Sequence, residues 1–242
     1  MWFEYKLEPY LNIDDFRAMY SGSYDIALTN LLRNELRSGD IFIDVGANVG
    51  YVSAVAASLV GRDGGVHSFE PLKPCFSRLE VLVRLNPGYD IVVNNFALGE
   101  TETVARIAFS LAGDSRNATL VPGTVKAESD TVPVRRLDRY ISATIRRPER
   151  IRLIKVDVEG FEFPVLLGLS EFFEGTPFRP LIVCEIKPWE LPKLNYTVDQ
   201  FDSYMKRYSY QAFSMVNRWR KVDFAKRAEF QQVLFRAQKT TI

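Results

Sequence analysis

A short segment at residues 44–50 (Asp-Val-Gly-Ala-Asn-Val-Gly) combines residue types that suit ligand binding, and it directly follows an apolar run. Glycine lets the backbone turn sharply and approach a ligand closely, and Asn48 tolerates a left-handed conformation better than most residues. A helix that begins directly after such a loop favours negatively charged groups at its N-terminus. The segment therefore predicts either a site for a nucleotide-like cofactor or an ordinary glycine-rich turn.

Glu70 separates these two interpretations. It follows the next apolar run along the chain and directly precedes Pro71. An acidic residue at the end of a second strand can accept hydrogen bonds from both hydroxyls of a ribose. The alternative is an acid that merely begins the following helix. With the glycine-rich loop already in place, the pair favours a ribose-containing cofactor.

Residues 155–160 (Lys-Val-Asp-Val-Glu-Gly) place one lysine and two carboxylates at the end of another apolar run. Such groups are costly to desolvate unless they serve a purpose, although a solvated loop with a structural salt bridge would look the same. A reaction that needs a base would have Asp157 and Glu159 as candidates, with Glu185 at the end of the next run. Lys155 could pair with a carboxylate or bind substrate.

Other residues that could act as a base or a metal ligand are few. The single histidine, His67, falls inside an apolar strand pattern, so we predict a packed core histidine rather than a base. No cluster of histidine and cysteine is present, which argues against zinc, and we predict no resident metal. A hard cation such as magnesium on Asp157, Glu159 and Glu185 stays open, because carboxylates are its preferred ligands.

The elements that must position these residues alternate between strands and helices. Glycine, proline and Asn-Pro-Gly signals separate the segments. A helix from Thr197 is predicted with a capping box that includes Gln200. We predict strands at residues 41–43, 66–69, 91–96, 103–110, 151–156, 181–186, 210–216 and 230–237, and helices at 49–60, 74–85 and 163–173.

This alternation predicts an α/β doubly wound sheet of about seven strands, parallel except for the last one. The chain reads as a single domain over residues 1–242, with an N-terminal helical cap at 1–38 and the core at 39–242. The stretch 111–130 is the least regular, and the charged stretch 217–229 is predicted to be a loop or short helix. Carboxyl ends of neighbouring strands then form the ligand crevice.

Composition excludes several classes of protein. The formal net charge of +1 gives no overall preference for nucleic acid or anionic membranes. Cys75 and Cys184 lie in apolar stretches and are predicted to be buried thiols. Without a signal-peptide pattern or an apolar run long enough to span a bilayer, a cytoplasmic protein is expected.

Seven arginines crowd residues 135–152, and we interpret them as a solvated, paired face rather than a phosphate site.

Five motifs follow one another along the chain: Ile-Asp-Val-Gly-Ala-Asn-Val-Gly-Tyr at 43–51, Ser-Phe-Glu-Pro at 68–71, Asn-Phe-Ala-Leu-Gly at 95–99, Ile-Lys-Val-Asp-Val-Glu-Gly at 154–160 and Val-Cys-Glu-Ile at 183–186. In their order and spacing, over about residues 24–190, they resemble the motifs of FkbM-type methyltransferases. One departure is Asp25, where that pattern has a glutamate, which weakens any role assigned to Tyr24 and Asp25.

The resemblance implies a class I, Rossmann-like methyltransferase fold with S-adenosylmethionine as methyl donor. It further implies O-methylation of a small-molecule acceptor, a hydroxyl of a sugar or secondary metabolite. In that family pattern Glu70 holds the ribose. Apart from the resemblance, Asp157 could hold the cofactor ammonium instead of acting as a base. The methionine side of the cofactor falls to Asp44, Gly46, Asn48 and Gly50, and the adenine to Phe96 and Ala97.

Two other functions remain open at the level of sequence. A nicotinamide-dependent oxidoreductase shares the glycine-rich loop and the acid after the second strand, but the loop lacks the Gly-x-Gly-x-x-Gly spacing. A binding module without catalysis could use the same fold. The charged residues 155–159 argue against both.

Overall fold

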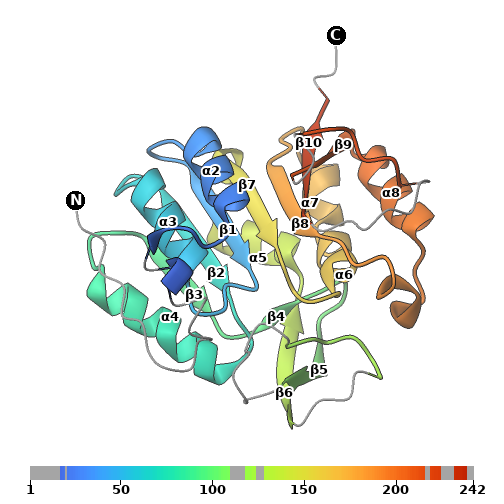
Figure 1. Cartoon of the computed structure of the whole chain (residues 1–242), viewed down its shortest axis with the longest axis horizontal. Helices are drawn as coiled ribbons and strands as arrows, with labels where there is room; N and C mark the ends of the chain where they lie inside the picture. Colours follow the sequence, from blue (N-terminus) through green and yellow to red (C-terminus); the bar gives the residue numbers. More distant parts are fainter. Residues whose placement is uncertain are drawn as a thin grey trace.

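The structure is a computed structural model of the chain, and it describes residues 17–19, 21–109, 118–123, 128–215, 219–224 and 232–238. Strands and helices alternate as predicted (Figure 1). In addition to two short 3₁₀ helices, the elements are α2 (Ile26–Glu35), β1 (Ile41–Val45), α3 (Tyr51–Val60), β2 (Gly65–Phe69), α4 (Lys73–Leu85), β3 (Ile91–Asn94), β4 (Ala97–Leu98), β5 (Thr103–Phe109), β6 (Glu128–Arg135), α5 (Leu137–Thr144), β7 (Ile151–Val156), α6 (Glu162–Leu167), α7 (Ser170–Gly175), β8 (Leu181–Glu185), α8 (Val198–Arg207), β9 (Tyr210–Ser214) and β10 (Gln232–Ala237).

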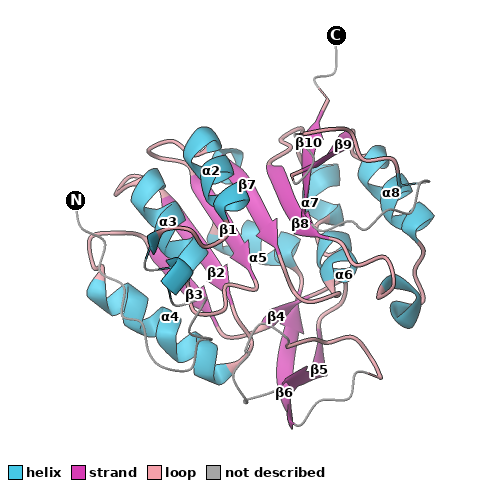
Figure 2. Ribbon diagram, in the orientation of Figure 1, coloured by secondary structure: helices cyan, strands magenta, loops and turns pink. Residues whose placement is uncertain are grey.

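A seven-stranded sheet in the order β3-β2-β1-β7-β8-β10-β9 forms the centre of the molecule (Figure 2). Strand β10 pairs antiparallel with β8 and with β9, and the other pairs are parallel. The predicted doubly wound α/β sheet, with its last strand inserted antiparallel, is confirmed. Strand order reverses between β1 and β7, and this switch point is where such sheets bind ligands.

Helices cover both faces of this sheet (Figure 2), and each face has its own apolar core. Helices α2, α3 and α4 pack on one face, and α5 to α8 pack on the other. Side chains alternate along a strand. Phe42 of β1 therefore faces the core that α2, α3 and α4 cover, and Ile43 faces the core that α5 to α8 cover. Asp44 must then point the same way as Phe42, toward α3.

A second, three-stranded sheet in the order β4-β6-β5 departs from the expected pattern. The strand predicted at 91–96 stops at Asn94, and the next residues leave the main sheet to pair with β6 as β4. Strand β6 was not predicted, because it reads Glu-Ser-Asp-Thr-Val-Pro-Val-Arg and buries only Val132 and Val134. A proline and exposed polar residues hide such a strand from a pattern search.

The helix predicted at 163–173 is two short helices, α6 and α7, which are separated at Gly168. A Cβ atom at Gly168 would overlap the backbone carbonyl of Gly99, so a tight crossing of two chain segments sets this break. The capping box at Thr197 and Gln200 is present as predicted. Residues 1–16 of the expected cap, and parts of the stretches 111–130 and 217–229, lie outside the described residues.

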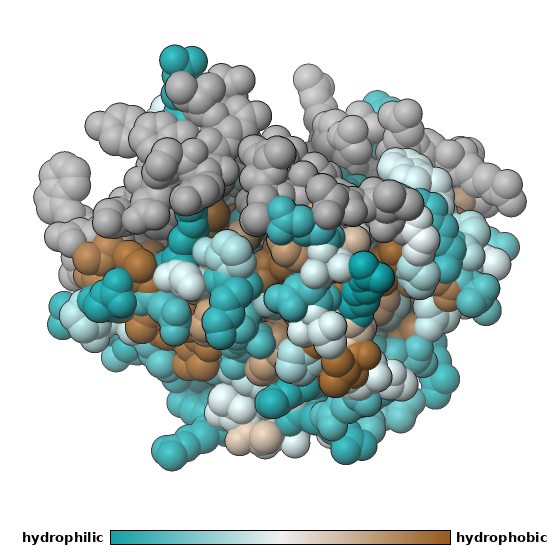
Figure 3. Space-filling model, turned by 90° about the horizontal axis from the view of Figure 1, so that it is seen from below, coloured by the Kyte–Doolittle hydropathy of each residue, from teal (hydrophilic) through white to brown (hydrophobic). Residues whose placement is uncertain are grey.

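Seen from below, the described residues show many hydrophilic side chains with separate apolar patches between them (Figure 3). Cys75 and Cys184 are buried free thiols, as predicted. Among the described residues, every helix is too short or too polar to cross a membrane.

Candidate active site

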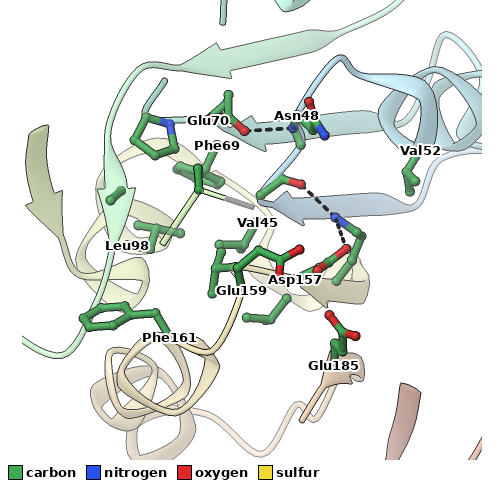
Figure 4. Close-up of a pocket in the computed structure, with 18 of the residues that line it drawn as sticks. Val45, Asn48, Val52, Phe69, Glu70, Leu98, Asp157, Glu159, Phe161 and Glu185 are labelled. Carbon is green, nitrogen blue, oxygen red and sulfur yellow. Dashed lines mark hydrogen bonds and ion pairs between the residues drawn. The ribbon is translucent and has the colours of Figure 1, made fainter. Parts of the chain in front are cut away.

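A cavity of about 310 Å³ opens at the carboxyl ends of β1, β2, β7 and β8, next to the switch point of the sheet. Figure 4 shows Glu70 and Asn48 along one side of it, and Asp157, Glu159 and Glu185 gathered at another. Volumes of this size are typical of small-molecule and cofactor sites. The three segments singled out in the sequence therefore converge on one cavity.

The glycine-rich loop after β1 needs residues that accept a positive φ. Gly46, Asn48 and Gly50 have φ values of 79°, 50° and 87°. The backbone N–H of Gly46 donates to the carbonyl of Phe69 at 3.0 Å, which ties the loop to β2. A Cβ atom at Gly46 would overlap the carbonyl oxygen of Asp157, so this position can only be glycine without a shift of the backbone.

Glu70 directly follows β2 and lines the cavity. Its Oε2 accepts a hydrogen bond from the backbone N–H of Asn48 and its Oε1 from that of Leu72, both at 2.9 Å. The side chain is buried, and burial raises its pKa to about 7 despite these two hydrogen bonds. One carboxylate thus fixes the loop and still faces the cavity with its remaining lone pairs.

An aromatic wall continues from Glu70. Phe69 and Phe96 lie edge to face with ring centroids 5.5 Å apart, and both line the cavity together with Ala97. The guanidinium of Arg135 lies 4.6 Å from the centre of the Phe96 ring. The predicted adenine residues Phe96 and Ala97 are therefore on the cavity wall, next to the predicted ribose residue.

The histidine is a packed core residue, as predicted. His67 is buried, and its Nδ1 shares a hydrogen bond of 2.8 Å with the hydroxyl of Tyr140. Burial lowers its pKa, with a smaller opposing effect from Asp90. It lies outside the described residues that line the cavity. The titratable side chains that do line the cavity include the carboxylates of Glu70, Asp157, Glu159 and Glu185.

Asp44 and Lys155 form a buried pair behind the loop. They are register partners on the parallel strands β1 and β7, and Lys155 Nζ lies 3.0 Å from Asp44 Oδ1. The ammonium also donates to the carbonyl of Gly46 at 2.9 Å, and Ser53 Oγ donates to Asp44 at 2.6 Å. Burial disfavours the charge on Lys155, but Asp44 and Asp157 outweigh it and raise its pKa.

This geometry places two predicted cofactor residues away from the cavity. Asp44 has no exposed surface, because its strand register points it toward α3. Gly50, the N-cap of α3, packs against Leu79. Neither is among the described residues that line the cavity, so any effect on a ligand would pass through the shape of the loop.

Three carboxylates meet at the other end of the cavity. Ligand oxygens of Asp157, Glu159 and Glu185 all lie within 4.8 Å of one another. Lys187, which the sequence analysis missed, ion-pairs with Glu159 and lies 3.4 Å from Glu185 Oε2. Burial and the nearby Asp157 raise the pKa of Glu185. The group could accept a proton or hold a cation, and an ammonium already lies beside two of its members.

Glu162, which the sequence analysis also missed, binds the backbone at this end of the cavity. Its Oε1 accepts hydrogen bonds from the backbone N–H groups of Val158 and Gly160, both at 3.0 Å. It is buried, and burial raises its pKa to about 8. The signal for it was an acid at the first position of a helix, directly after a glycine-containing loop.

The N-terminal part of the chain closes one wall of the cavity. Asp25 caps α2 with its side chain and has a φ of 42°. Its Oδ2 accepts a hydrogen bond from Gln232 Nε2 at 2.7 Å, and both residues line the cavity. Tyr24 packs edge to face on Tyr51, with ring centroids 5.3 Å apart. Because Gln232 is the register partner of Glu185, this wall adjoins the three carboxylates.

Several of the arginines at 135–152 make contacts within the protein. Arg136 pairs with the buried Asp138 at 2.5 Å, and Arg150 donates to the carbonyl of Asp63 at 2.6 Å. Two further pairs are Arg147 with Glu149 and Arg152 with Glu35.

Comparison with known proteins agrees with this picture. A family model described as the methyltransferase FkbM domain matches residues 44–212. A solved FkbM methyltransferase from Methylobacillus flagellatus KT has a similar fold, with a TM-score of 0.52 and 16% sequence identity. That alignment covers 93% of this chain and 58% of the solved one.

A second likeness is to the AMB antimetabolite synthetase AmbE of Pseudomonas aeruginosa. The sequences are 31% identical over an alignment of 166 residues, which covers 54% of this chain and 8% of the synthetase. The chain thus spans a small part of that curated relative and a little over half of the solved structure.

Proposed function

The chain belongs to the FkbM methyltransferase family, and we propose that it methylates a hydroxyl group of a small molecule, either a sugar or a secondary metabolite. It has the class I methyltransferase fold, with S-adenosylmethionine as its methyl donor. The observation that carries the proposal for a hydroxyl acceptor is the group Asp157, Glu159 and Glu185 beside the cofactor cavity. A hydroxyl must lose its proton during methyl transfer, and carboxylates supply a base.

The cavity wall supports S-adenosylmethionine at the positions expected for it. Gly46 packs directly against the backbone of Asp157, which follows β7, so no side chain stands between the loop and this strand end. Each oxygen of Glu70 accepts one backbone hydrogen bond and keeps a lone pair for a ribose hydroxyl. Phe96 and Ala97 offer an apolar surface to the adenine. When bound, S-adenosylmethionine supplies an electrophilic methyl group, and its transfer depends strongly on alignment.

Asp157 or Glu159 is the proposed base, with Glu185 as the remaining candidate. The Asp157 side chain is 42% exposed and lies 3.7 Å from Lys155, so an acceptor can reach it. Glu159 is held by Lys187 at the cavity wall. Because Lys155 already contacts Asp44 and the loop carbonyl of Gly46, we assign it a positioning role rather than contact with substrate.

One relative bears on the acceptor, and only through its name: the matched synthetase is named for an antimetabolite. The alternative of a nicotinamide-dependent oxidoreductase loses its support, because the family match covers the glycine-rich loop that the two classes share.

An isotope-transfer assay tests the proposal. S-adenosylmethionine with a labelled methyl group is incubated with the protein and a panel of neutral sugars, amino sugars and hydroxylated aromatic compounds. We expect label on an acceptor oxygen, identified by NMR of the product. Label on nitrogen or carbon alone would disprove the hydroxyl assignment. Titration calorimetry with S-adenosylmethionine and with NAD separately tests the cofactor, and the expected result is heat from the first alone.

A further inference from the structure

Lys187 follows β8 by two residues and places its ammonium among the carboxylates at the end of the cavity. Its Nζ ion-pairs with Glu159 Oε2 and lies 3.4 Å from Glu185 Oε2. Only 20% of its side chain is exposed. Burial disfavours its charge, but the two glutamates more than compensate and raise its pKa, so the lysine is charged throughout the physiological range.

The carboxylates around it need this charge. Oxygens of Asp157, Glu159 and Glu185 lie within 4.8 Å of one another, and like charges at this distance repel. Carboxylate oxygens are the ligands that hard cations prefer, and a cation placed among them would offset their repulsion. Here an ammonium from the chain already bridges two of the three.

Other contacts hold the backbone on which Glu159 stands. Its φ is 55°, its carbonyl accepts a hydrogen bond from Thr119 Oγ1 at 2.8 Å, and Glu162 binds the N–H groups on either side. These contacts fix the backbone. The ion pair with Lys187 acts on the carboxylate itself.

We propose that Lys187 is a positioning residue that acts as the internal cation of the acceptor site, bridging Glu159 and Glu185 where a divalent metal ion would otherwise bind. The ammonium offsets the repulsion between the two carboxylates and holds them at the cavity wall. The positioning role rests on the methyltransferase function proposed above. The bridging itself can be measured without turnover.

Calcium binding is the direct test. Lys187→Met keeps the apolar stem of the side chain and removes the charge, so the freed carboxylates should bind added calcium chloride. Since one neighbouring charge is removed, we expect calorimetry to show affinity about tenfold to a hundredfold above that of the wild type. Lys187→Arg should stay like the wild type. Glu185→Gln combined with Lys187→Met should lose the gain.

Lys206→Met is the matched control, because Lys206 pairs with Asp202 at 2.6 Å on the exposed surface of α8. It should bind calcium no better than the wild type. An equal calcium affinity of the wild type and Lys187→Met would overturn the proposal. Lys187→Gln repeats the measurement if circular dichroism shows that the methionine variant does not fold.

Turnover is the second measurement, once an acceptor is known. Lys187→Met should lower kcat at least tenfold with S-adenosylmethionine affinity within twofold of the wild type, and Lys187→Arg should restore most of the rate. An unchanged kcat in Lys187→Met would overturn the positioning role. If no acceptor is methylated by the wild type, the proposed function fails, while the calcium result still decides whether Lys187 is the bridging cation.

Discussion

The two ends of the cavity are held together by different kinds of interaction. At the proposed cofactor end, the contacts beside the cavity involve backbone groups: Gly46 donates to a β2 carbonyl, and Glu70 accepts two backbone N–H groups. At the proposed acceptor end, charged and polar side chains from segments far apart in sequence meet, such as Glu159 with Lys187 and Asp25 with Gln232.

This difference determines how each end can fail. Backbone bonding depends on φ and on close approach, so the cofactor end is sensitive to an added Cβ atom. Ion pairs depend on charge, so the acceptor end is sensitive to loss of charge while its shape is kept. Matched substitutions can therefore separate binding of the donor from reaction of the acceptor.

The largest effect is expected from removing the base. Asp157→Asn and Glu159→Gln keep the size of each side chain and remove its charge. The variant that lacks the base should turn over about 10²–10⁴-fold more slowly, with S-adenosylmethionine affinity close to that of the wild type. Steady-state rates on the true acceptor and calorimetry with the cofactor measure the two properties.

Two other results would change this assignment. If Asp157→Asn loses cofactor binding, that residue holds the methionine part of the cofactor, and Glu159 remains as the base. If both variants keep normal turnover, the base lies elsewhere, and Glu185→Gln becomes the next variant to measure.

A steric change at the cofactor end should have the next largest effect. Gly46→Ala introduces a Cβ that overlaps the Asp157 carbonyl at a φ of 79°. We expect a loss of about 2–4 kcal/mol in the free energy of unfolding, from backbone strain plus overpacking. Urea denaturation measures it.

Gly123→Ala is the control for this substitution. Gly123 has a nearly identical φ of 77°, and no atom of the described residues lies within 4 Å of the position that an added Cβ would take. It should lose only the strain, about 1 kcal/mol. Equal losses in the two variants would show that the close approach at Gly46 contributes nothing.

Glu70 should give a smaller effect that depends on pH. Glu70→Gln should weaken S-adenosylmethionine binding about tenfold to a hundredfold, the range for a buried hydrogen bond to a charged group. Because burial raises its pKa to about 7, the carboxylate is ionised in only a minority of molecules at pH 6. The wild-type affinity should therefore rise from pH 6 to pH 8. Glu70→Gln should flatten that rise in calorimetric titrations.

The raised pKa of Glu70 makes the free energy of unfolding fall with pH, whereas the cofactor affinity should rise. The folded-state pKa of Glu70 lies above its unfolded value of 4.5, so the protonated form favours folding. Its contribution is complete below pH 4.5 and is lost as the pH rises to about 7. A stability difference between wild type and Glu70→Gln that stays constant from pH 4 to pH 8 would contradict the shifted pKa.

The cofactor end could be predicted largely from sequence because its signals are local. The glycine-rich loop, Asn48 with its positive φ and Glu70 at the next strand end each follow from a few neighbouring residues. Strand alternation also gives the position of Asp44, because Asp44 and Phe42 lie on the same face of β1. The motif alone assigned Asp44 to the cofactor and did not take this alternation into account.

The acceptor end could be predicted only in part. Asp157 and Glu159 stood out within one motif. The role of Lys187 became visible only when β7 and β8 were placed side by side, and that of Gln232 only when β10 was placed beside β8. Strand β6 was missed for a similar reason, since its partners β4 and β5 supply the pairing that its own residues do not indicate. Long-range pairing of polar side chains has no local signature.

The smallest effect is expected at Asp25, where the N-terminal wall meets the acceptor end. Asp25 accepts from the N–H of Leu28 as the cap of α2 and from Gln232 across the cavity wall, at 3.1 and 2.7 Å. Asp25→Ala removes both contacts and should cost about 1 kcal/mol of unfolding free energy, the usual cost of a lost cap. Asp25→Asn should cost less, because asparagine caps helices well and tolerates the left-handed φ of 42°. Since the wall adjoins Glu185, Asp25→Ala should also raise the KM for the acceptor while the affinity for S-adenosylmethionine stays unchanged. A loss of S-adenosylmethionine affinity in Asp25→Ala, with an unchanged acceptor KM, would instead assign this wall to the cofactor and remove the boundary drawn between the two ends.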